Sequence, residues 1–119
     1  LPLEELVSDW PWILQPESSP ARIGFDEALQ RLALPLPADI IECSSVYSMQ
    51  QLIQLTDAIM VLSESALRDY LKMGLVVELP VELEVTLAPF GILLRKGEPV
   101  SHELGLFIDL LRHKARALD

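Results

Sequence analysis

Residues 12–20, WILQPESSP, pass from an apolar run typical of a buried strand to a polar junction typical of a helix start. Ser19 suits an N-cap, and Pro20 suits the first helical position because the N–H that proline lacks would have no partner there. The apolar residues that follow have the spacing of an amphipathic helix: Phe25, Ala28, Leu29 and Leu32. The other faces of this helix carry polar side chains: Arg22, Asp26, Glu27 and Gln30. The stretch therefore predicts a strand, Trp10–Leu14, that leads directly into a helix.

The same order of segments occurs twice more along the chain. Asp39–Cys43 is a short apolar strand followed by a serine pair and a second helical pattern. Ala58–Leu62 is a third strand, with Ser63 as the next N-cap and Gly74 where a C′ glycine would end the helix. Parallel strands need crossover connections, which are usually helices. The predicted fold class is α/β, a three-layer lobe with a mostly parallel sheet flanked by helices.

The pattern changes after residue 74. Apolar and polar residues alternate over Val77–Leu87, which predicts a strand with one core face and one acidic face. Pro80 cannot donate to a ladder, so it indicates a sheet edge or a break. Phe90–Arg95 reads as a further strand and residues 96–99 as a turn. Ser101 is the expected cap of a long C-terminal helix with one apolar stripe: Leu104, Phe107, Ile108, Leu111, Ala115 and Leu118.

Composition excludes several classes of protein. The net charge of −9, from nine basic and eighteen acidic residues, disfavours direct contact with nucleic acid by this chain. No apolar stretch approaches the length of a membrane span, so we expect no membrane association. Cys43 is the only cysteine, which excludes an internal disulfide and fits a cytoplasmic protein. Because the sequence begins with Leu1 rather than Met, we expect it to be part of a longer chain.

Residues that would indicate catalysis, a metal or a cofactor are missing. The sequence has no Gly-rich phosphate loop, no nucleophile elbow and no metal-ligand spacing. The two histidines, His102 and His113, are separated by about three helical turns and are interpreted as surface or cap residues. The acidic residues of the alternating segment are interpreted as a solvated strand face. We expect neither an enzyme nor a bound cofactor or metal ion.

Two serine pairs are the remaining polar feature. Ser18 and Ser19 follow the first predicted strand, and Ser44 and Ser45 follow the second. The carboxyl ends of parallel strands meet at one edge, which is where open α/β sheets bind ligands. Helix N-termini there offer N–H groups and partial positive charge, so the pairs predict a site for a small anion such as a carboxylate. The alternative is that these serines only cap helices.

Five stretches occur in an order that resembles the effector-binding domain of LysR-type transcriptional regulators. They are W-I-L-Q-P-x-S-S-P-x-R, I-E-C-S-S, I-M-V-L-S-E-S-A-L-R-D-Y-L-K-M-G-L-V-V-E-L-P, P-F-G-I-L-L-R-K-G and the closing amphipathic helix. The resemblance runs from about Leu6 to Arg112, and none of the stretches is diagnostic by itself. It implies a domain like a type 2 periplasmic binding protein, in which two lobes enclose a ligand cleft.

The resemblance also implies a layout and a site. Residues 1–9 would be the first crossover segment, 10–84 the second lobe, and 85–119 the return crossover strand and a C-terminal helix that belongs to the first lobe. The implied ligand-binding residues are Gln15, Ser18, Ser19, Ser44, Ser45 and Val46. The chain departs from the usual family pattern at four positions: Thr56, Asp57, Ala58 and Ser63. Asp57 is expected near the cleft mouth, where a negative charge would oppose an anionic effector.

The function implied by the resemblance is small-molecule sensing. An effector would bind between the lobes and bias their geometry, which would be relayed to DNA-binding domains that this chain lacks. The uncovered apolar stripe of the last helix predicts a homo-oligomer or an exchange of elements between copies. One alternative is a lobe of a periplasmic-type solute-binding protein. Another is a small α/β enzyme, for which the chain has too few catalytic candidates.

Overall fold

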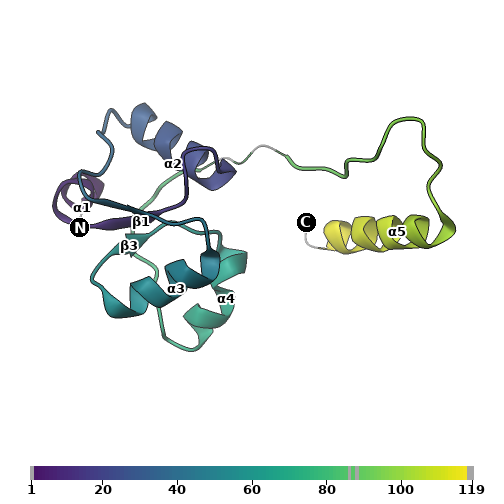
Figure 1. Ribbon diagram of the computed structural model, residues 1–119. Coiled ribbons are helices and arrows are strands. Elements are labelled where there is room, and N and C mark those ends of the chain that lie inside the picture. The colour runs from purple at the N-terminus through teal and green to yellow at the C-terminus, as the bar shows by residue number, and fades with distance from the viewer. Residues whose placement is uncertain (1, 86, 88, 118–119) are drawn as a thin grey trace. The chain divides into compact units, whose positions relative to one another are not determined.

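The computed structural model describes residues 2–85, 87 and 89–117 (Figure 1). The chain divides into two units, Leu1–Pro89 and Phe90–Asp119, which are described separately. In the described part of the first unit, the strands are β1 (Trp12–Leu14), β2 (Ile40–Glu42) and β3 (Ile59–Met60). Its helices are α1 (Leu3–Asp9), α2 (Pro20–Arg31), α3 (Val46–Leu55) and α4 (Glu64–Lys72). The strands are shorter than the sequence predicted, and α1 was not predicted.

The three strands form one parallel sheet in the order β2-β1-β3. Trp12 of β1 lies opposite Ile40 of β2 and Ile59 of β3. Since β2 and β3 lie on opposite sides of β1, the connection through α3 has to cross β1 to reach β3. The predicted α/β class, with a parallel sheet flanked by helices, is confirmed.

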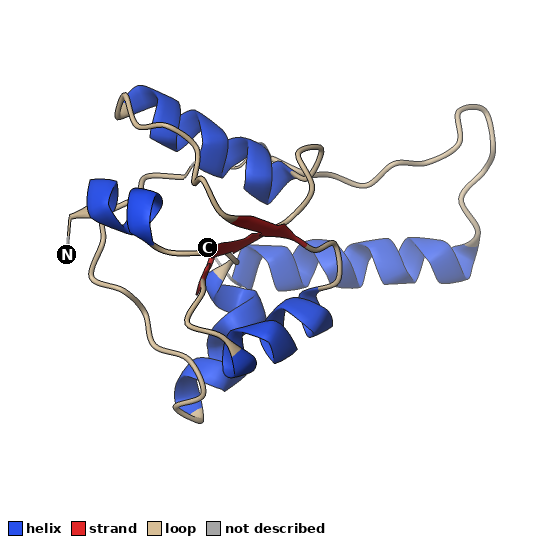
Figure 2. Cartoon of the chain, turned by 60° about the vertical axis from the view of Figure 1, so that its left-hand side comes forward, coloured by secondary structure: helices blue, strands red, loops and turns tan. Residues whose placement is uncertain are grey.

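Helices cover both faces of this sheet (Figure 2). Trp12 and Leu14 pack on one face with α1 and with Phe25 of α2, whose ring centroid lies 5.2 Å from that of Trp12. Ile13 points to the other face and packs with Met49 of α3. All three residues of β1 are buried, as expected for a central parallel strand with helices on both sides.

Helices α2, α3 and α4, each of which follows a strand of the sheet, begin with a serine N-cap, as the sequence predicted. In each case the serine hydroxyl accepts a hydrogen bond from the backbone N–H three residues later. That N–H is one of the four at the start of a helix that have no partner within the helix. The caps are Ser19, Ser45 and Ser63, with oxygen to nitrogen distances of 3.1, 3.2 and 3.4 Å. The strand-to-helix junctions are therefore fixed by local side-chain chemistry.

Helices α2 and α4 end in the same hydrogen-bonded turn with different residues at its left-handed position. That position is Ala33 after α2, with φ of 56°, and Gly74 after α4, with φ of 72°. The N–H of Leu34 donates to the carbonyl of Leu29 at 2.9 Å, and the equivalent bond closes α4 at 2.9 Å. This is the Schellman motif, which glycine suits and alanine does not.

We expect Ala33→Gly to raise the free energy of unfolding by about 0.5–1 kcal/mol. Glycine has no Cβ, so the steric cost of the left-handed conformation at position 33 disappears. Part of this gain in stability is lost because glycine also gives the unfolded chain more conformational entropy. Gly74→Ala is the reciprocal control and should lower the free energy of unfolding by about 1 kcal/mol. A Cβ at Gly74 meets no atom within 4 Å, so that cost is conformational. Urea unfolding measures both, and a less stable Ala33→Gly variant would contradict the expectation.

Two sequence predictions within the first unit are wrong or partly wrong. Leu32 was placed by its spacing on the apolar face of the predicted helix, but it is the C-cap of α2 and 53% exposed because the helix ends there. The alternating segment Val77–Leu87 forms no strand in its described residues, because no neighbouring strand pairs with it. Its side chains still alternate locally: Val81 and Leu83 pack against the core around β1, while Glu82 is exposed.

The second unit contains a turn and one long helix. Phe90–Arg95 was expected to be a strand, but its backbone has no ladder partner among the described residues, so the prediction is wrong for this structure. The turn at 96–99 is confirmed, with Gly97 at φ 83° and an Arg95–Glu98 ion pair of 2.8 Å. Ser101 caps α5 (His102–Ala117) as predicted, at 3.1 Å from the N–H of Leu104.

The apolar stripe of α5 is largely uncovered. Leu104, Phe107 and Leu111 are 39%, 56% and 42% exposed, and Ile108 is buried. Leu118, the last predicted member of the stripe, lies outside the described residues. In the part of the chain that the structure describes, no helix is both long enough and apolar enough to span a bilayer.

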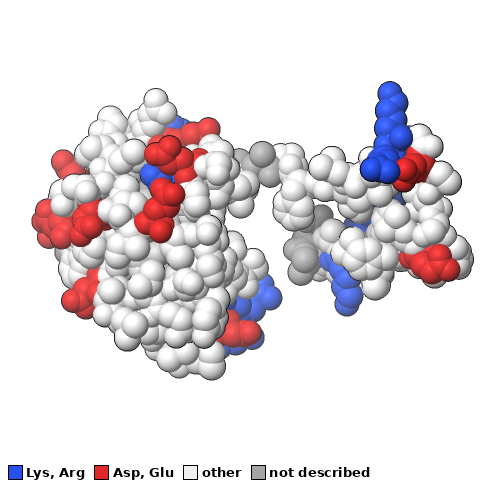
Figure 3. All heavy atoms as spheres, viewed as in Figure 1, with Lys and Arg blue, Asp and Glu red and all other residues white. Residues whose placement is uncertain are grey.

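Charge is distributed unevenly between the two units. Residues 1–89 contain 14 acidic and four basic residues, a net charge of −10, and acidic side chains predominate on the face of this unit shown in Figure 3. Residues 90–119 contain four acidic and five basic residues, a net charge of +1. The acidity of the protein therefore belongs to the unit that contains the sheet.

Candidate functional site

The two predicted serine pairs lie at the same edge of the sheet. Strands β1 and β2 are parallel neighbours in register, with Leu14 opposite Glu42 at their carboxyl ends. The Cys43 N–H donates to the Leu14 carbonyl at 2.9 Å, which continues the pairing one residue beyond β2. The loops that carry Ser18 and Ser44 leave from these strand ends, so the prediction that both pairs share one edge is confirmed.

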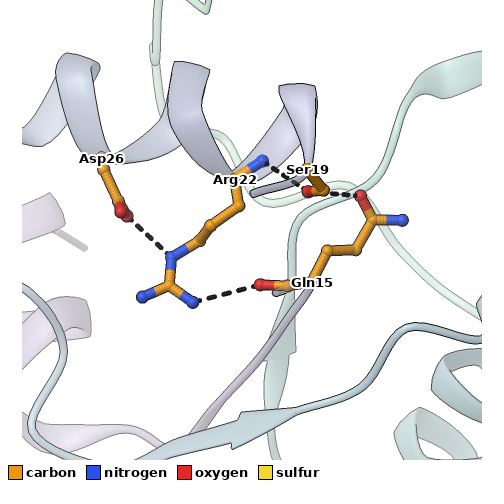
Figure 4. A network of polar contacts seen from close by, with 4 residues as sticks. All are labelled: Gln15, Ser19, Arg22 and Asp26. Atoms are coloured by element: carbon orange, nitrogen blue, oxygen red, sulfur yellow. Dashed lines mark hydrogen bonds and ion pairs between the residues drawn. The ribbon is translucent and has the colours of Figure 1, made fainter. Parts of the chain in front are cut away.

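The first loop is held by a polar network (Figure 4). The Ser19 hydroxyl donates to Gln15 Oε1 at 3.1 Å and accepts from the Arg22 N–H at 3.1 Å. Arg22 donates through Nη1 to the Gln15 carbonyl at 3.1 Å and through Nε to Asp26 Oδ1 at 2.9 Å. The guanidinium thus ties the end of β1 to the first turns of α2, and the network fixes the start of the helix.

The burial of Arg22 differs from what the sequence predicted. Its spacing placed it on a polar helix face, but the residue is only 4% exposed, whereas its partner Asp26 has a side chain 31% exposed. A buried charge needs a partner and hydrogen bonds, and Arg22 has both. The signal available in the sequence was the i, i+4 spacing of Arg22 and Asp26, but burial depends on where α2 packs.

The second loop is simpler. Ser45 caps α3, its carbonyl accepts a weak hydrogen bond from Cys43 Sγ at 3.5 Å, and Val46 begins the helix with 36% of its surface exposed. In the described residues, no hydrogen bond involves the hydroxyl of Ser44 or that of Ser18, and both residues are exposed. The six candidates therefore divide into two groups. Gln15, Ser19 and Ser45 have structural partners, while Ser18, Ser44 and Val46 face solvent at the edge.

A third serine belongs to this edge, although it was predicted only as a helix cap and not as a site residue. Ser63 follows β3, caps α4, and its hydroxyl lies 3.2 Å from that of Ser65. Because β3 is parallel to β1, Ser63 leaves the sheet at the same edge as the two pairs. The repeated order of strand, serine and helix was the signal for it. The edge therefore carries three helix starts rather than two.

Asp57, which was expected near the cleft mouth, does not lie at the serine edge. It precedes β3, and the Ile59 N–H donates to the carbonyl of Pro11, just before β1, at 2.9 Å. Asp57 is therefore at the amino edge of the sheet, opposite to the serines, because β1 and β3 run in the same direction. Its negative charge is thus not placed to oppose an anionic ligand at the serine edge.

The hollows of the first unit differ in size and in place. A cavity of about 620 Å³ lies along β3 and is lined mostly by apolar side chains. A smaller hollow sits between Leu14, Gln15 and Arg22 at the serine edge. No group of three His, Cys, Asp or Glu side chains in the described part of the chain is placed to hold a metal ion.

Comparison with protein families and known proteins shows which family the chain resembles. The model of the family described as the LysR substrate binding domain matches residues 1–116, which is nearly the whole chain. No curated protein and no solved structure matches the chain.

Proposed function

The chain belongs to the LysR substrate-binding domain family, and from this premise we propose that it binds a small-molecule effector in a cleft between two lobes. The family is one of regulatory domains rather than enzymes, so the chain is the effector-sensing part of a LysR regulator. We propose that residues 10–84 form the second lobe, 1–9 the first crossover, and 85–119 the return crossover and a helix of the first lobe. The division of the chain at Pro89 supports this layout.

The observation that carries the proposed site is the meeting of three serine-capped helix starts at one edge of a parallel sheet. Such an edge is the usual ligand-binding edge of α/β folds. The first N–H groups of each helix have no intrahelical partner, and the helix dipoles place partial positive charge there. A carboxylate is therefore the effector chemistry that the edge favours.

The proposed residues have different roles at this edge. Ser18 and Ser44 would donate to the effector, because their hydroxyls are exposed and make no hydrogen bond within the described structure. Ser19, Ser45 and Gln15 would orient the helix starts, because their side chains already have partners. Val46 would supply apolar contact. No bond of the effector is made or broken.

The proposed mechanism is a population shift between inter-lobe geometries. An effector that contacts both lobes can bind one inter-lobe geometry more tightly than the other. The difference between these two affinities sets how far the effector shifts the population toward the favoured geometry. That geometry would reposition the subunits of a cytoplasmic homo-oligomer and, through them, DNA-binding domains outside this chain. The chain itself, with a net charge of −9, would not contact DNA. The family match favours a regulator over a solute-binding protein.

The experiment begins with the native protein, whose intact mass and N-terminal sequence should show a longer chain with a basic helix-turn-helix segment. On that protein, a panel of small carboxylates is screened by thermal shift and confirmed by calorimetric titration. We expect at least one carboxylate to bind, and Ser44→Ala and Ser18→Ala each to weaken it about tenfold, because a hydrogen bond to a charged group is lost. Binding by neutral analogues alone would contradict the proposed chemistry.

The matched control is Ser8→Ala. Ser8 is an exposed serine of α1 whose hydroxyl bonds to Glu5 and Asp9, away from the serine edge. We expect it to leave effector affinity unchanged. If Ser8→Ala weakens binding as much as Ser44→Ala, the loss reflects general destabilisation and the proposed site is wrong.

A further inference from the structure

Two polar side chains are buried among the described residues of the first unit, Arg22 and Gln50. Burial of a polar group costs free energy unless hydrogen bonds replace those that it made with water. Arg22 uses its bonds to tie the end of β1 to the first turns of α2. Gln50 of α3 is 8% exposed and donates through Nε2 to the Ala66 carbonyl of α4 at 3.2 Å. Gln50 therefore joins two helices that both begin at the serine edge (Figure 1).

The bond from Gln50 reaches the first turn of α4. Ala66 is the residue whose N–H donates to the Ser63 hydroxyl at 3.4 Å, so a single residue carries both the cap and the bond from Gln50. The Ala66 carbonyl is also placed to accept the N–H four residues later within the helix. Gln50 therefore adds a hydrogen bond to a carbonyl that the helix already uses. The added bond fixes the position of the turn rather than its formation.

The sheet does not fix this turn in the way that it fixes the loop after β2. After β2, the Cys43 N–H continues the pairing with β1. After β3, no backbone hydrogen bond joins residues 61–63 to β1 in the described structure. Among the hydrogen bonds that residues 61–66 make there, the bond from Gln50 is the one that reaches a different element. The position of the start of α4 therefore depends on Gln50.

A second glutamine of α3 holds the other end of α4. Gln54 follows Gln50 by four residues, which places both on the same face of the helix. Its Nε2 donates to the Leu75 carbonyl, beyond the end of α4, at 2.7 Å. The two glutamines thus make the same kind of bond at opposite ends of α4, and Gln50 holds the end at the serine edge.

We propose that Gln50 is a positioning residue of the effector site, because it fixes the start of α4 relative to the start of α3. This inference rests on the proposed function, in which the effector binds at the serine edge. The partial positive charge of a helix acts on an anion only near its first turn, so a displaced helix start contributes little. A start that is already fixed before the effector binds lowers the ordering cost of binding.

Gln50→Met tests this role in the native protein. Methionine has a similar volume but no donor, and the Ala66 carbonyl keeps its partner within the helix, so the unit should still fold. Hydrogen exchange at residues 67–70, the first N–H groups with partners inside α4, should become about tenfold faster than in the wild type. Affinity for the tightest-binding carboxylate of the panel, and for acetate as the simplest probe, should fall about fivefold.

Gln54→Met is the matched control. It removes a bond of the same kind from the same helix, but at the far end of α4. We expect exchange at residues 67–70 and carboxylate affinity to stay at their wild-type values. Gln50→Asn is the second variant, in which the amide is retained but is one methylene too short to reach Ala66. It should behave as Gln50→Met does, and it decides the question if Gln50→Met does not fold.

Three outcomes would overturn the inference. One is exchange at residues 67–70 that keeps its wild-type rate in the Gln50 variants, and another is an equal loss of affinity in Gln54→Met. The third is faster exchange with unchanged carboxylate affinity, which would leave the proposed function standing. If the wild type binds no carboxylate, the proposed function itself is wrong and this inference falls with it, and the wild-type titration shows this before any variant is compared.

Discussion

Replacing Phe25 with alanine should lower the free energy of unfolding of the first unit by about 3–5 kcal/mol. The Phe25 ring is fully buried between α2 and the sheet, and it stacks at a 34° tilt against Trp12. The variant loses the transfer free energy of the ring and leaves a cavity among side chains that can close around it only in part. For a protein of ordinary stability this is a large fraction of the total.

Urea unfolding followed by tryptophan fluorescence measures this effect, because Trp12 itself contacts the Phe25 ring. The control is Ile23→Ala on the same helix, at a side chain that is 45% exposed. It should cost less than about 1 kcal/mol, since little apolar area is lost from the interior. Equal losses for the two variants would mean that α2 does not pack through the face seen here.

The core around Phe25 could be predicted from the sequence because its signals are local. Serine, proline and the helical spacing after residue 18 define α2, and a serine cap with helical spacing likewise defines α3 and α4. Once three strands are known to alternate with helices, parallel pairing follows from the crossover connections. The shared edge of the serine pairs follows in turn.

The errors arise where structure depends on a partner rather than on local sequence. The patterns of Val77–Leu87 and Phe90–Arg95 predict strands, but a strand exists only beside another strand, and the described residues provide none there. Alternation indicates which side chains are buried, and Val81 and Leu83 keep that burial. The residues of these two segments do not by themselves determine whether a neighbouring strand pairs with them.

At the candidate site, too, features set by local sequence could be predicted, and features that depend on three-dimensional packing could not. Ser19 and Ser45 were predictable as caps, and their use as caps means that their hydroxyls are already engaged. Burial of Arg22 and the position of Asp57 could not be predicted, because each depends on how a helix or a strand is placed in three dimensions. The exposed serines, Ser18 and Ser44, are the ones whose hydroxyls make no hydrogen bond in the described structure. This is why the effector experiment is directed at them.

Arg22→Met should lower the free energy of unfolding by about 2 kcal/mol. Methionine retains much of the buried aliphatic stem, so the loss comes from the guanidinium and its hydrogen bonds to Asp26 and to the Gln15 carbonyl. Removing one member of a buried pair costs about 3–5 kcal/mol when the other is left uncompensated in the interior. The Asp26 side chain is 31% exposed and can be hydrated, which reduces the expected cost.

The same variant should also loosen the loop between β1 and α2, because Arg22 is the side chain that joins Gln15 to Asp26. Hydrogen exchange at residues 15–19 should accelerate in Arg22→Met relative to the wild type, while exchange in α3 should not change. Asp26→Asn is the matched comparison: it keeps the shape and one acceptor oxygen, but it leaves the buried Arg22 guanidinium without an opposite charge, so it should cost about 3 kcal/mol. If Asp26→Asn costs as much as Arg22→Met, the ion pair is the main contribution. If only Arg22→Met loosens the loop, the bond to the Gln15 carbonyl holds the serine edge in place, and effector affinity should fall with it.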